Sequence, residues 1–560
     1  MEADSVSAPV PGSADSSVAA FYAGKTVLLT GATGFLGKVL LEKLLWECCG
    51  PAGAAVRLLV RPQAGASGSS RLESLLRSPV FDRLRRRYRD NFSIFIERTV
   101  RVVEGDMERE CLGLSTEDFD ALSTTTDVIL HCAALVKWSS PLDVSMRSNA
   151  LGSQRIAQLA LAGRMAGREV HIVLVSTAFV HGRRTGQCPE HLVHSDDDSF
   201  NAAGEVEVCL RRAAEVDAEA STPVRRAEFH RMSRQRLGPQ ADKDKLDGMA
   251  ADLRRRWVQD TMTRWGEARA QGWGWNDCYT FSKVVGEHLA AQVLSDVPYS
   301  IVRPSGIVAA TKEPAPGWID AYLLVEPLIE GVGRGQITSF PGDPRCVIDC
   351  VPVDFVCNAI LSAAAKQPPS AGPHVYQCAS GDIYPNTLAN IEATWIEYFK
   401  RDPMLDSRGQ PPRLNPIQYH VDLDGFARGM RRRYLMPLSG VTSMVELFPG
   451  WENFARLRDA RGWLTRKRRT VEKVLDLASL YSNYTLNEWV FETANTRAMM
   501  AGLSKDDQQR FPYFPIVGKP EASQAWDWAE FWTKLHIPGM RHWVLRDKPS
   551  PPGLAAFSKL

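Results

Sequence analysis

The chain has 560 residues, of which 44% are hydrophobic and 24% are charged, the ordinary composition of a folded globular protein. This composition excludes a collagen-like or wholly disordered chain, and the length suits one large α/β domain with a smaller second domain. The 67 Lys and Arg residues nearly balance the 65 Asp and Glu residues, so the net charge of +2 gives no indication of nucleic-acid binding.

Cysteine spacing and targeting signals limit the cellular compartments in which we expect the protein. The 11 cysteines include no C-x-x-C pair, so we expect no zinc ribbon and a reducing compartment. Residues 1–20 lack the features of a signal peptide, and the most apolar stretch, residues 346–365, contains two aspartates, so we expect no transmembrane helix. The ending Ser558-Lys559-Leu560 predicts recognition by the peroxisomal import receptor in a eukaryote; in a bacterium it would be chance and the protein cytoplasmic.

The first predicted elements form a strand–turn–helix–strand unit. Residues 25–30 are a short apolar run that predicts a buried parallel strand. A glycine-rich turn over 31–37 follows directly, then a helix over 38–48 and a second strand over 55–61. Such a βαβ unit, within about 30 residues, is typical of the opening of a Rossmann fold.

The alternation of strands and helices continues along the chain. Further strands are predicted over residues 100–104, 127–130, 170–175 and 299–302. This order favours an α/β fold with a doubly wound parallel sheet. Two charged stretches, residues 71–97 and 190–270, interrupt it, and we expect both to be helical insertions at the rim of the sheet.

The last part of the sequence differs in character, because tryptophans become frequent and helical patterns dominate. We therefore expect a flexible tail over 1–20, a Rossmann domain over 21–424, a separate helical domain over 425–546 and a tail over 547–560. Within the helical domain, the basic clusters 431–433 and 466–469 are interpreted either as a binding site for phosphates or anionic lipid, or as a solvated basic face.

The glycine turn has the spacing of a dinucleotide-binding loop. Glycines at these points permit a tight turn and let the backbone approach a pyrophosphate at the N-terminus of the following helix. The alternative is a glycine-rich turn without a ligand. The turn residues expected at the cofactor are Gly31, Thr33, Gly34, Phe35, Leu36 and Gly37.

The end of the second strand indicates which dinucleotide binds. An acid there would accept a hydrogen bond from the ribose 2′-OH of NAD, but the strand ends at Arg61 and the first acid is Glu73. An arginine suits the 2′-phosphate of NADP, so we predict NADPH, with a solvated arginine as the alternative. Asp106, after the third strand, is expected either to accept a hydrogen bond from the adenine or to cap a turn.

Tyr279 and Lys283 form the most informative pair, because side chains four apart on a helix share one face. The ammonium would lower the pKa of the tyrosine and bond the nicotinamide ribose, so the tyrosine could give a proton to a carbonyl oxygen during hydride transfer. The strand over 170–175 is followed by Ser176 and Thr177. A hydroxyl at the carboxyl end of that strand is where we expect the third catalytic residue, beside Tyr279 and Lys283.

Residues after two other strands are expected near the cofactor. Ala133 is small enough for the cofactor to lie against the backbone, while the neighbouring His131 is interpreted as a packing residue. Pro304 and Ser305, which follow the strand after the catalytic helix, are expected to flank the nicotinamide.

Together these motifs resemble an extended short-chain dehydrogenase/reductase and, more closely, the fatty acyl-CoA reductases. The resemblance covers about residues 21–545, including a helical C-terminal domain of the type these reductases carry. Residues 275–283 look most like the bacterial alcohol-forming branch. The segments that carry the resemblance are 21–25, 175–182, 279–283, 313–320 and 348–354.

The resemblance implies that a long-chain acyl-CoA is reduced by NADPH, in two hydride transfers through a bound aldehyde, to a primary alcohol. It implies Thr177 as the catalytic hydroxyl, with Ser176 as the neighbouring alternative, Tyr279 as proton donor and Lys283 as the residue that tunes it. Since hydride attacks directly, Cys278 reads as structural. Animal members end in membrane-spanning segments; here we expect none, and any membrane contact would be peripheral.

Other readings stay open at this stage. The enzyme could release the aldehyde, and the acyl donor could be an acyl carrier protein thioester. A non-catalytic NADP-binding scaffold is disfavoured by the intact set of Thr177, Tyr279 and Lys283. A nucleotide-sugar epimerase or dehydratase is disfavoured by the C-terminal domain and the region around Trp318.

Overall fold

The computed structural model describes residues 17–547, apart from residues 51–52, 63–64, 66, 138–139, 196, 198, 239, 407, 449, 452–453 and 516–525. The tail predicted over 547–560, with its Ser558-Lys559-Leu560 ending, lies outside the described residues except for Asp547. The tail predicted over 1–20 is too long, because helix α1 (Val18–Tyr22) begins within it. The hydroxyl of Ser17 caps this helix, and the phenol of Tyr22 donates a hydrogen bond to the Leu361 carbonyl at 3.0 Å.

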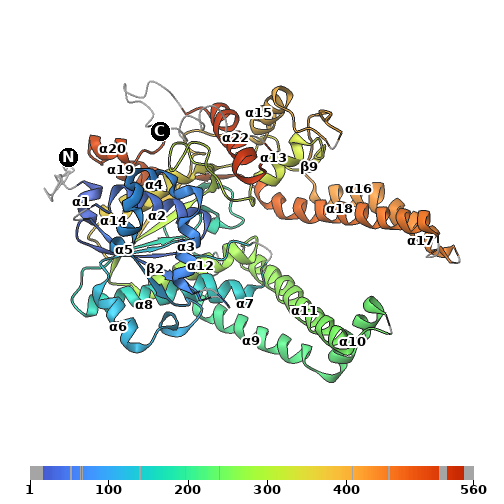
Figure 1. Cartoon of the computed structure of the whole chain (residues 1–560), viewed down its shortest axis with the longest axis horizontal. Helices are drawn as coiled ribbons and strands as arrows, with labels where there is room; N and C mark the ends of the chain where they lie inside the picture. Colours follow the sequence, from blue (N-terminus) through green and yellow to red (C-terminus); the bar gives the residue numbers. More distant parts are fainter. Residues whose placement is uncertain are drawn as a thin grey trace, which may run out of the picture.

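A seven-stranded parallel sheet runs through the body of the molecule (Figure 1). Its strand order is β11-β7-β5-β4-β1-β2-β3. This is the predicted doubly wound arrangement, in which the strand order reverses between β1 and β4. The strands are β1 (Thr26–Thr30), β2 (Ala55–Val60), β3 (Val100–Glu104), β4 (Val128–His131), β5 (His171–Val175), β7 (Pro298–Pro304) and β11 (Gly372–Cys378).

The predicted strands are all present, but the edge strand β11 was not predicted. Its sequence mixes glycine, proline, histidine and glutamine with a few apolar residues, so it lacks the continuous apolar run of a central strand. Within the sheet it pairs with β7, and Pro373 is tolerated because an edge strand need not donate every hydrogen bond.

Helices cover both faces of the sheet, as its alternating side chains require. On β1, Val27 and Leu29 join the core cluster that contains α2 and α14, while Leu28 joins the cluster that contains α6, α8 and α12. The stretch predicted as a helical insertion at 71–97 is helical. The helices are α2 (Phe35–Glu47), α3 (Gly68–Leu76), α4 (Asp82–Tyr88), α5 (Phe92–Thr99), α6 (Thr116–Thr125), α8 (Leu151–Met165), α12 (Cys278–Val293) and α14 (Val353–Ala365).

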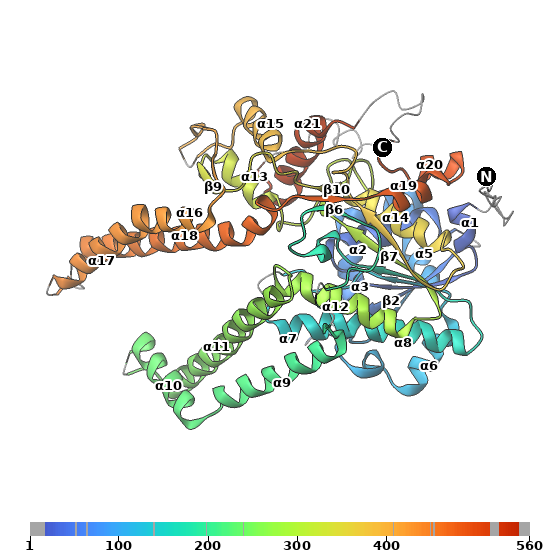
Figure 2. The ribbon, with the colours of Figure 1, turned by 180° about the vertical axis from the view of Figure 1, so that it is seen from behind.

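Two helical arms project from the same side of this body (Figures 1 and 2). The first arm is the insertion predicted over 190–270 and contains α9 (Ala202–Ala220), α10 (Pro223–Leu237) and α11 (Lys243–Gly272). The second arm contains α16 (Leu423–Met430), α17 (Met436–Leu447) and α18 (Ala455–Thr485), with a π-helical turn over Arg431–Leu435 joining the first two.

Beyond the second arm the chain returns to the body. Strand β13 (Trp489–Phe491) pairs in parallel with β6 (Gly186–Cys188), and α19 (Ala494–Ala501) packs on α14 and β11. A Cβ atom on Gly317 would lie 2.5 Å from the Leu535 carbonyl oxygen, so the two backbones touch.

The predicted C-terminal helical region is therefore present but not separate. Met500, Phe511 and Trp532 belong to the same apolar core as the strands of the sheet. The boundary predicted between residues 424 and 425 falls inside α16. The helical pattern was visible in the sequence, whereas the packing of these helices onto the sheet depends on contacts between segments far apart in the chain.

Candidate active site

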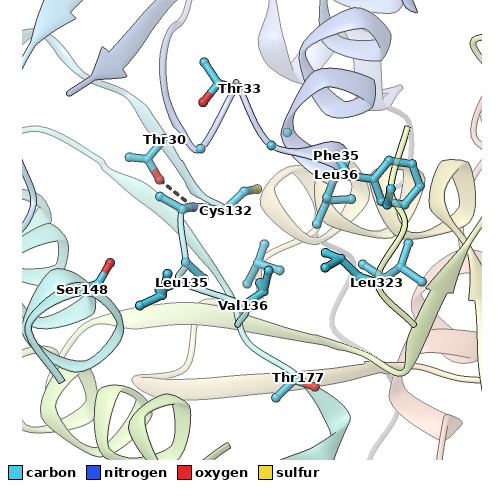
Figure 3. A pocket seen from close by; sticks show the side chains of 18 of the residues that line it. Thr30, Thr33, Phe35, Leu36, Cys132, Leu135, Val136, Ser148, Thr177 and Leu323 are labelled. Carbon is cyan, nitrogen blue, oxygen red and sulfur yellow. Dashed lines mark hydrogen bonds between the residues drawn. The ribbon is translucent and has the colours of Figure 1, made fainter. Parts of the chain in front are cut away.

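A pocket of about 960 Å³ lies at the carboxyl ends of the strands, beside the point where the strand order reverses. Figure 3 shows Thr33 on one side of this pocket and Thr177 on the other, with Leu135, Val136 and Leu323 between them. The structure brings all the site residues singled out from the sequence to this one pocket. They are Gly31, Thr33, Gly34, Phe35, Leu36, Gly37, Arg61, Asp106, Ala133, Thr177, Tyr279, Lys283, Pro304 and Ser305.

The glycine turn is shaped for a ligand that approaches the backbone. Gly31 has a φ of +77°, and a Cβ atom there would lie 2.6 Å from the Ala133 nitrogen, so glycine is required. A Cβ atom on Gly37 would collide with the Gly31 carbonyl. Gly34 caps α2 without a side chain, which leaves the N–H groups of the first helical turn open to the pocket. Such a helix N-terminus suits the diphosphate of a dinucleotide.

Hydrogen bonds fix the loop that follows β4. The Thr30 hydroxyl accepts a hydrogen bond from the Ala133 nitrogen at 3.1 Å and lies 2.8 Å from Nδ1 of His131 (Figure 3 shows the former). Burial lowers the pKa of His131 to about 3, so the imidazole is neutral, and the ring is 1% exposed. This placement agrees with the packing role expected for His131.

Asn149, for which no role was predicted from the sequence, connects this loop to α12. Its side-chain oxygen accepts from the Leu135 nitrogen at 2.7 Å, and its side-chain nitrogen donates to the Leu135 carbonyl at 3.1 Å. The same nitrogen lies 2.9 Å from the Ser282 hydroxyl on α12. No motif marks Asn149, because its role depends on two segments that are distant in the sequence.

Two arginines lie at the end of the pocket next to β2. Arg61 forms an ion pair with Glu108 at 3.1 Å, and its side chain is 57% exposed. Arg71, on α3, also lines the pocket and donates a hydrogen bond to the Arg61 carbonyl. Asp106 accepts a hydrogen bond from the Glu108 nitrogen at 3.0 Å, so it caps a turn, one of its two predicted roles. Arg71 and Glu108 were missed because each enters the pocket from a neighbouring loop or helix.

Lys283 is held at the carboxyl end of β5. Its ammonium donates a hydrogen bond to the Val175 carbonyl at 2.7 Å. Burial lowers the pKa of Lys283 to about 8, against the opposing influence of the Glu287 carboxylate on the next turn. The hydroxyl of Thr177, two residues beyond Val175, donates to the Pro304 carbonyl at 3.4 Å.

Tyr279 has a raised pKa, not the lowered one expected from its lysine neighbour. The surrounding protein keeps water from the phenol, and the charge of Asp277 adds to the rise, while a hydrogen bond with Thr177 opposes it. The Lys283 ammonium is instead bonded to the Val175 carbonyl. Tyr279 is therefore protonated at neutral pH, the form that can donate a proton. The contact with Thr177 distinguishes that hydroxyl from Ser176, and the catalytic role of either stays a prediction.

Tyr484 brings the C-terminal region into the pocket wall. It lies in the last turn of α18, and its phenol donates a hydrogen bond to Asp277 at 3.3 Å. Asp277 in turn caps α12 by accepting from the Thr280 nitrogen at 2.8 Å. The Tyr484 ring packs edge-on against Phe179 with the ring centroids 4.9 Å apart. No local pattern marks this tyrosine, since its partners lie about two or three hundred residues earlier in the chain.

Several apolar side chains at the mouth of the pocket are exposed to solvent. Leu323 is 59% exposed and Val136 is 49% exposed. An apolar rim beside buried hydrogen-bonding groups suits a substrate with a long hydrocarbon part and one polar reacting group. The apolar side chains at the mouth are Leu135, Val136, Val144, Tyr322, Leu323 and Leu324.

Comparisons with known proteins agree with this geometry. Two family models, each described as "Male sterility protein", match residues 29–360 and 454–547. "Fatty acyl-CoA reductase 2, chloroplastic" of Arabidopsis thaliana is 28% identical over 541 residues, which cover 95% of this chain and 80% of the relative. "Alcohol-forming fatty acyl-CoA reductase" of Simmondsia chinensis is 24% identical over 535 residues, with 94% and 99% covered.

A solved structure supports the fold. The terminal R domain from the myxalamid PKS-NRPS biosynthetic pathway superposes with a TM-score of 0.51 at 18% identity, and 94% of this chain and 93% of that chain are covered. At this level of identity the likeness shows a shared architecture alone.

Proposed function

Because this chain belongs to the fatty acyl-CoA reductase family, whose models match most of it, we propose that it reduces a long-chain fatty acyl-CoA to the primary alcohol with two molecules of NADPH. The family predicted from the sequence is confirmed, and with it an oxidoreductase with an NAD(P)-binding Rossmann domain. The observation that carries the proposal is the meeting of Thr177, Tyr279 and Lys283 in one pocket with an apolar mouth. We also propose that the chain belongs to the bacterial alcohol-forming branch of this family.

The residues that line the pocket fit a nicotinamide adenine dinucleotide phosphate. The open N–H groups at the start of α2 would hold the diphosphate, and Gly31 and Gly37 leave room that any Cβ atom would fill. Arg61 and Arg71 would hold the 2′-phosphate, and Lys283 would hold the nicotinamide ribose. When bound, this cofactor supplies the hydride.

The protein's own groups handle the proton. Tyr279, protonated at neutral pH, donates it to the thioester carbonyl oxygen as negative charge develops there. Thr177 orients the phenol through its hydrogen bond, which also stabilises the phenolate that remains.

The same groups serve both reductions. In the first, the carbonyl carbon gains a hydride and the oxygen gains a proton, which gives a hemithioacetal. Its C–S bond then breaks, so that CoA leaves as the thiol and an aldehyde remains. In the second, the aldehyde carbon gains a hydride and its oxygen gains a proton from Tyr279, which has been reprotonated in between. Each alcohol therefore consumes two hydrides and two protons.

The stoichiometry of the reaction tests the proposal. Purified protein is incubated with palmitoyl-CoA and NADPH, and NADPH oxidation, free CoA and lipid products are quantified. Two NADPH oxidised per CoA released, with fatty alcohol as product, supports it. One NADPH per CoA with accumulating aldehyde would overturn the alcohol-forming step. Parallel assays with palmitoyl-acyl carrier protein compare the two acyl donors, and no NADPH oxidation with either, over a range of chain lengths, would overturn the reaction class.

A further inference from the structure

The far end of the second arm exposes large apolar side chains that soluble surfaces normally scatter or cover. Leu447 is 80% exposed and Met444 is 73% exposed, both on α17. Phe448 and Phe454 are about half exposed and pack edge-on against each other with centroids 5.7 Å apart. Figures 1 and 2 place α17 and the start of α18 at the end of the arm that is remote from the body. We call Met444, Leu447, Phe448 and Phe454 the apolar tip.

Basic residues flank the apolar tip on both helices. Residues 431–470 contain ten Lys or Arg residues against three Asp or Glu residues. The clusters 431–433, in the turn before α17, and 466–469, on α18, are exposed throughout. Trp463 is 51% exposed on the same helix, and the Lys467 ammonium lies 5.9 Å from its ring centroid. The segment thus combines an exposed apolar end with a concentrated positive charge.

We infer that the second arm docks on an anionic lipid bilayer, with the apolar tip inserted at the level of the acyl chains and the clusters 431–433 and 466–469 on the head groups. An amphipathic helical segment with cations beside its apolar side chains is the form in which proteins lie at a membrane interface. Anionic lipid surfaces attract such cations. In the part of the chain that the structure describes, no helix is long and apolar enough to span a membrane.

Charge complementarity selects the bilayer over a second copy of the chain. Two such arms placed tip to tip would bring the same excess of positive charge together, and this repulsion opposes a dimer. On an anionic surface this repulsion is absent, because the negative head groups attract the same positive charges. The arm also ends at the pocket, because α18 carries Tyr484 in its last turn. The docking concerns a surface outside the pocket and stands whether or not the proposed reaction is correct.

Vesicle co-sedimentation of the full chain tests the inference without any turnover. We expect the protein to bind vesicles of phosphatidylcholine with phosphatidylserine, to bind pure phosphatidylcholine vesicles weakly, and to lose binding as salt is raised. The double variant Leu447→Ser, Phe448→Ser should weaken binding by about tenfold or more, since two large apolar groups no longer leave water. The double variant Arg466→Glu, Arg469→Glu should remove the preference for anionic vesicles.

A matched control comes from the body. Met165, at the end of α8, is 81% exposed but stands away from the second arm, so Met165→Ser should bind vesicles like the unmodified protein. All variants should keep the melting temperature and the reduction of soluble acyl-CoA. Failure of the unmodified protein to bind anionic vesicles, or unchanged binding by the tip variant, would overturn the inference. A concentration-dependent dimer that the tip variant abolishes would also overturn it, by showing a second copy as the occupant.

Discussion

The two ends of the pocket are built in different ways. The nucleotide end, which consists of residues 30–37, 60–61, 71, 105–108 and 132–136, comes from the first quarter of the chain, and each segment except Arg71 on α3 lies at the end of a strand of one sheet. The proposed catalytic end, called the catalytic end below, consists of Thr177, Tyr279, Lys283, Pro304 and Tyr484, which come from widely separated parts of the chain. The first end depends on backbone shape, and the second depends on burial and on the charges of distant neighbours. The predictions below test that difference.

The largest effect is expected from Tyr279→Phe, which removes the proposed proton donor and leaves the nucleotide end intact. Turnover of acyl-CoA should fall by about 10²- to 10⁴-fold, the usual contribution of a positioned acid. NADPH binding, followed by the quenching of protein fluorescence, should change little. The control is Cys278→Ala on the same helix, a buried residue that does not line the pocket and should keep turnover. An equal loss of NADPH affinity in Tyr279→Phe would contradict the independence of the two ends.

The pH dependence should come from the catalytic end. Because the pKa of Lys283 is lowered to about 8, its ammonium is present below that pH and is lost as the pH rises through it. Turnover should therefore fall above about pH 8, by about tenfold for each further pH unit. Initial rates at saturating NADPH measure this limb. In Lys283→Arg, which stays charged, any remaining activity should show no such limb; an unchanged limb would assign it to another group.

Cofactor choice should depend on the nucleotide end alone. Arg71→Ala should lower kcat/KM for NADPH by about ten- to a hundredfold, since a charge-assisted contact to the 2′-phosphate is lost, and should leave NADH use unchanged. Arg61→Ala should act in the same direction. Glu108→Ala frees Arg61 from its ion pair and is expected to favour NADPH further. Equal losses with both cofactors would show that the arginines serve the fold instead of the phosphate.

The smallest effect is expected from Tyr484→Phe, which keeps the ring against Phe179 but removes the hydrogen bond to Asp277. The net free energy that such a hydrogen bond contributes predicts a fall in kcat of about fivefold with little change in KM for NADPH. Because Asp277 caps α12 and its charge contributes to the raised pKa of Tyr279, a shift in the pH profile of kcat should accompany the fall. A purely structural role would lower the melting temperature and leave that profile unchanged.

The sequence supported the nucleotide end well, because its signals are local. A glycine turn between a strand and a helix specifies where Gly31 and Gly37 must lie, and Arg61 follows directly from the strand end. The roles of Arg71, Asn149 and Tyr484 were not predicted, because no local sequence pattern indicates which residues they contact. The predicted lowering of the pKa of Tyr279 was wrong for the same reason. The spacing shows that Lys283 shares a helix face with Tyr279, but it does not show that the ammonium is bonded to the Val175 carbonyl.

The pairing of β13 with β6 and the contact of Gly317 with Leu535 also bear on how the chain is synthesised. Both join the last part of the chain to segments made two or three hundred residues earlier. The core that contains Trp532 can close only after residue 532 has left the ribosome, so this core stays incomplete while the preceding residues are translated. Apolar side chains of the sheet lack their last partners during that interval, and we expect the yield of folded protein to depend on chaperones that shield them.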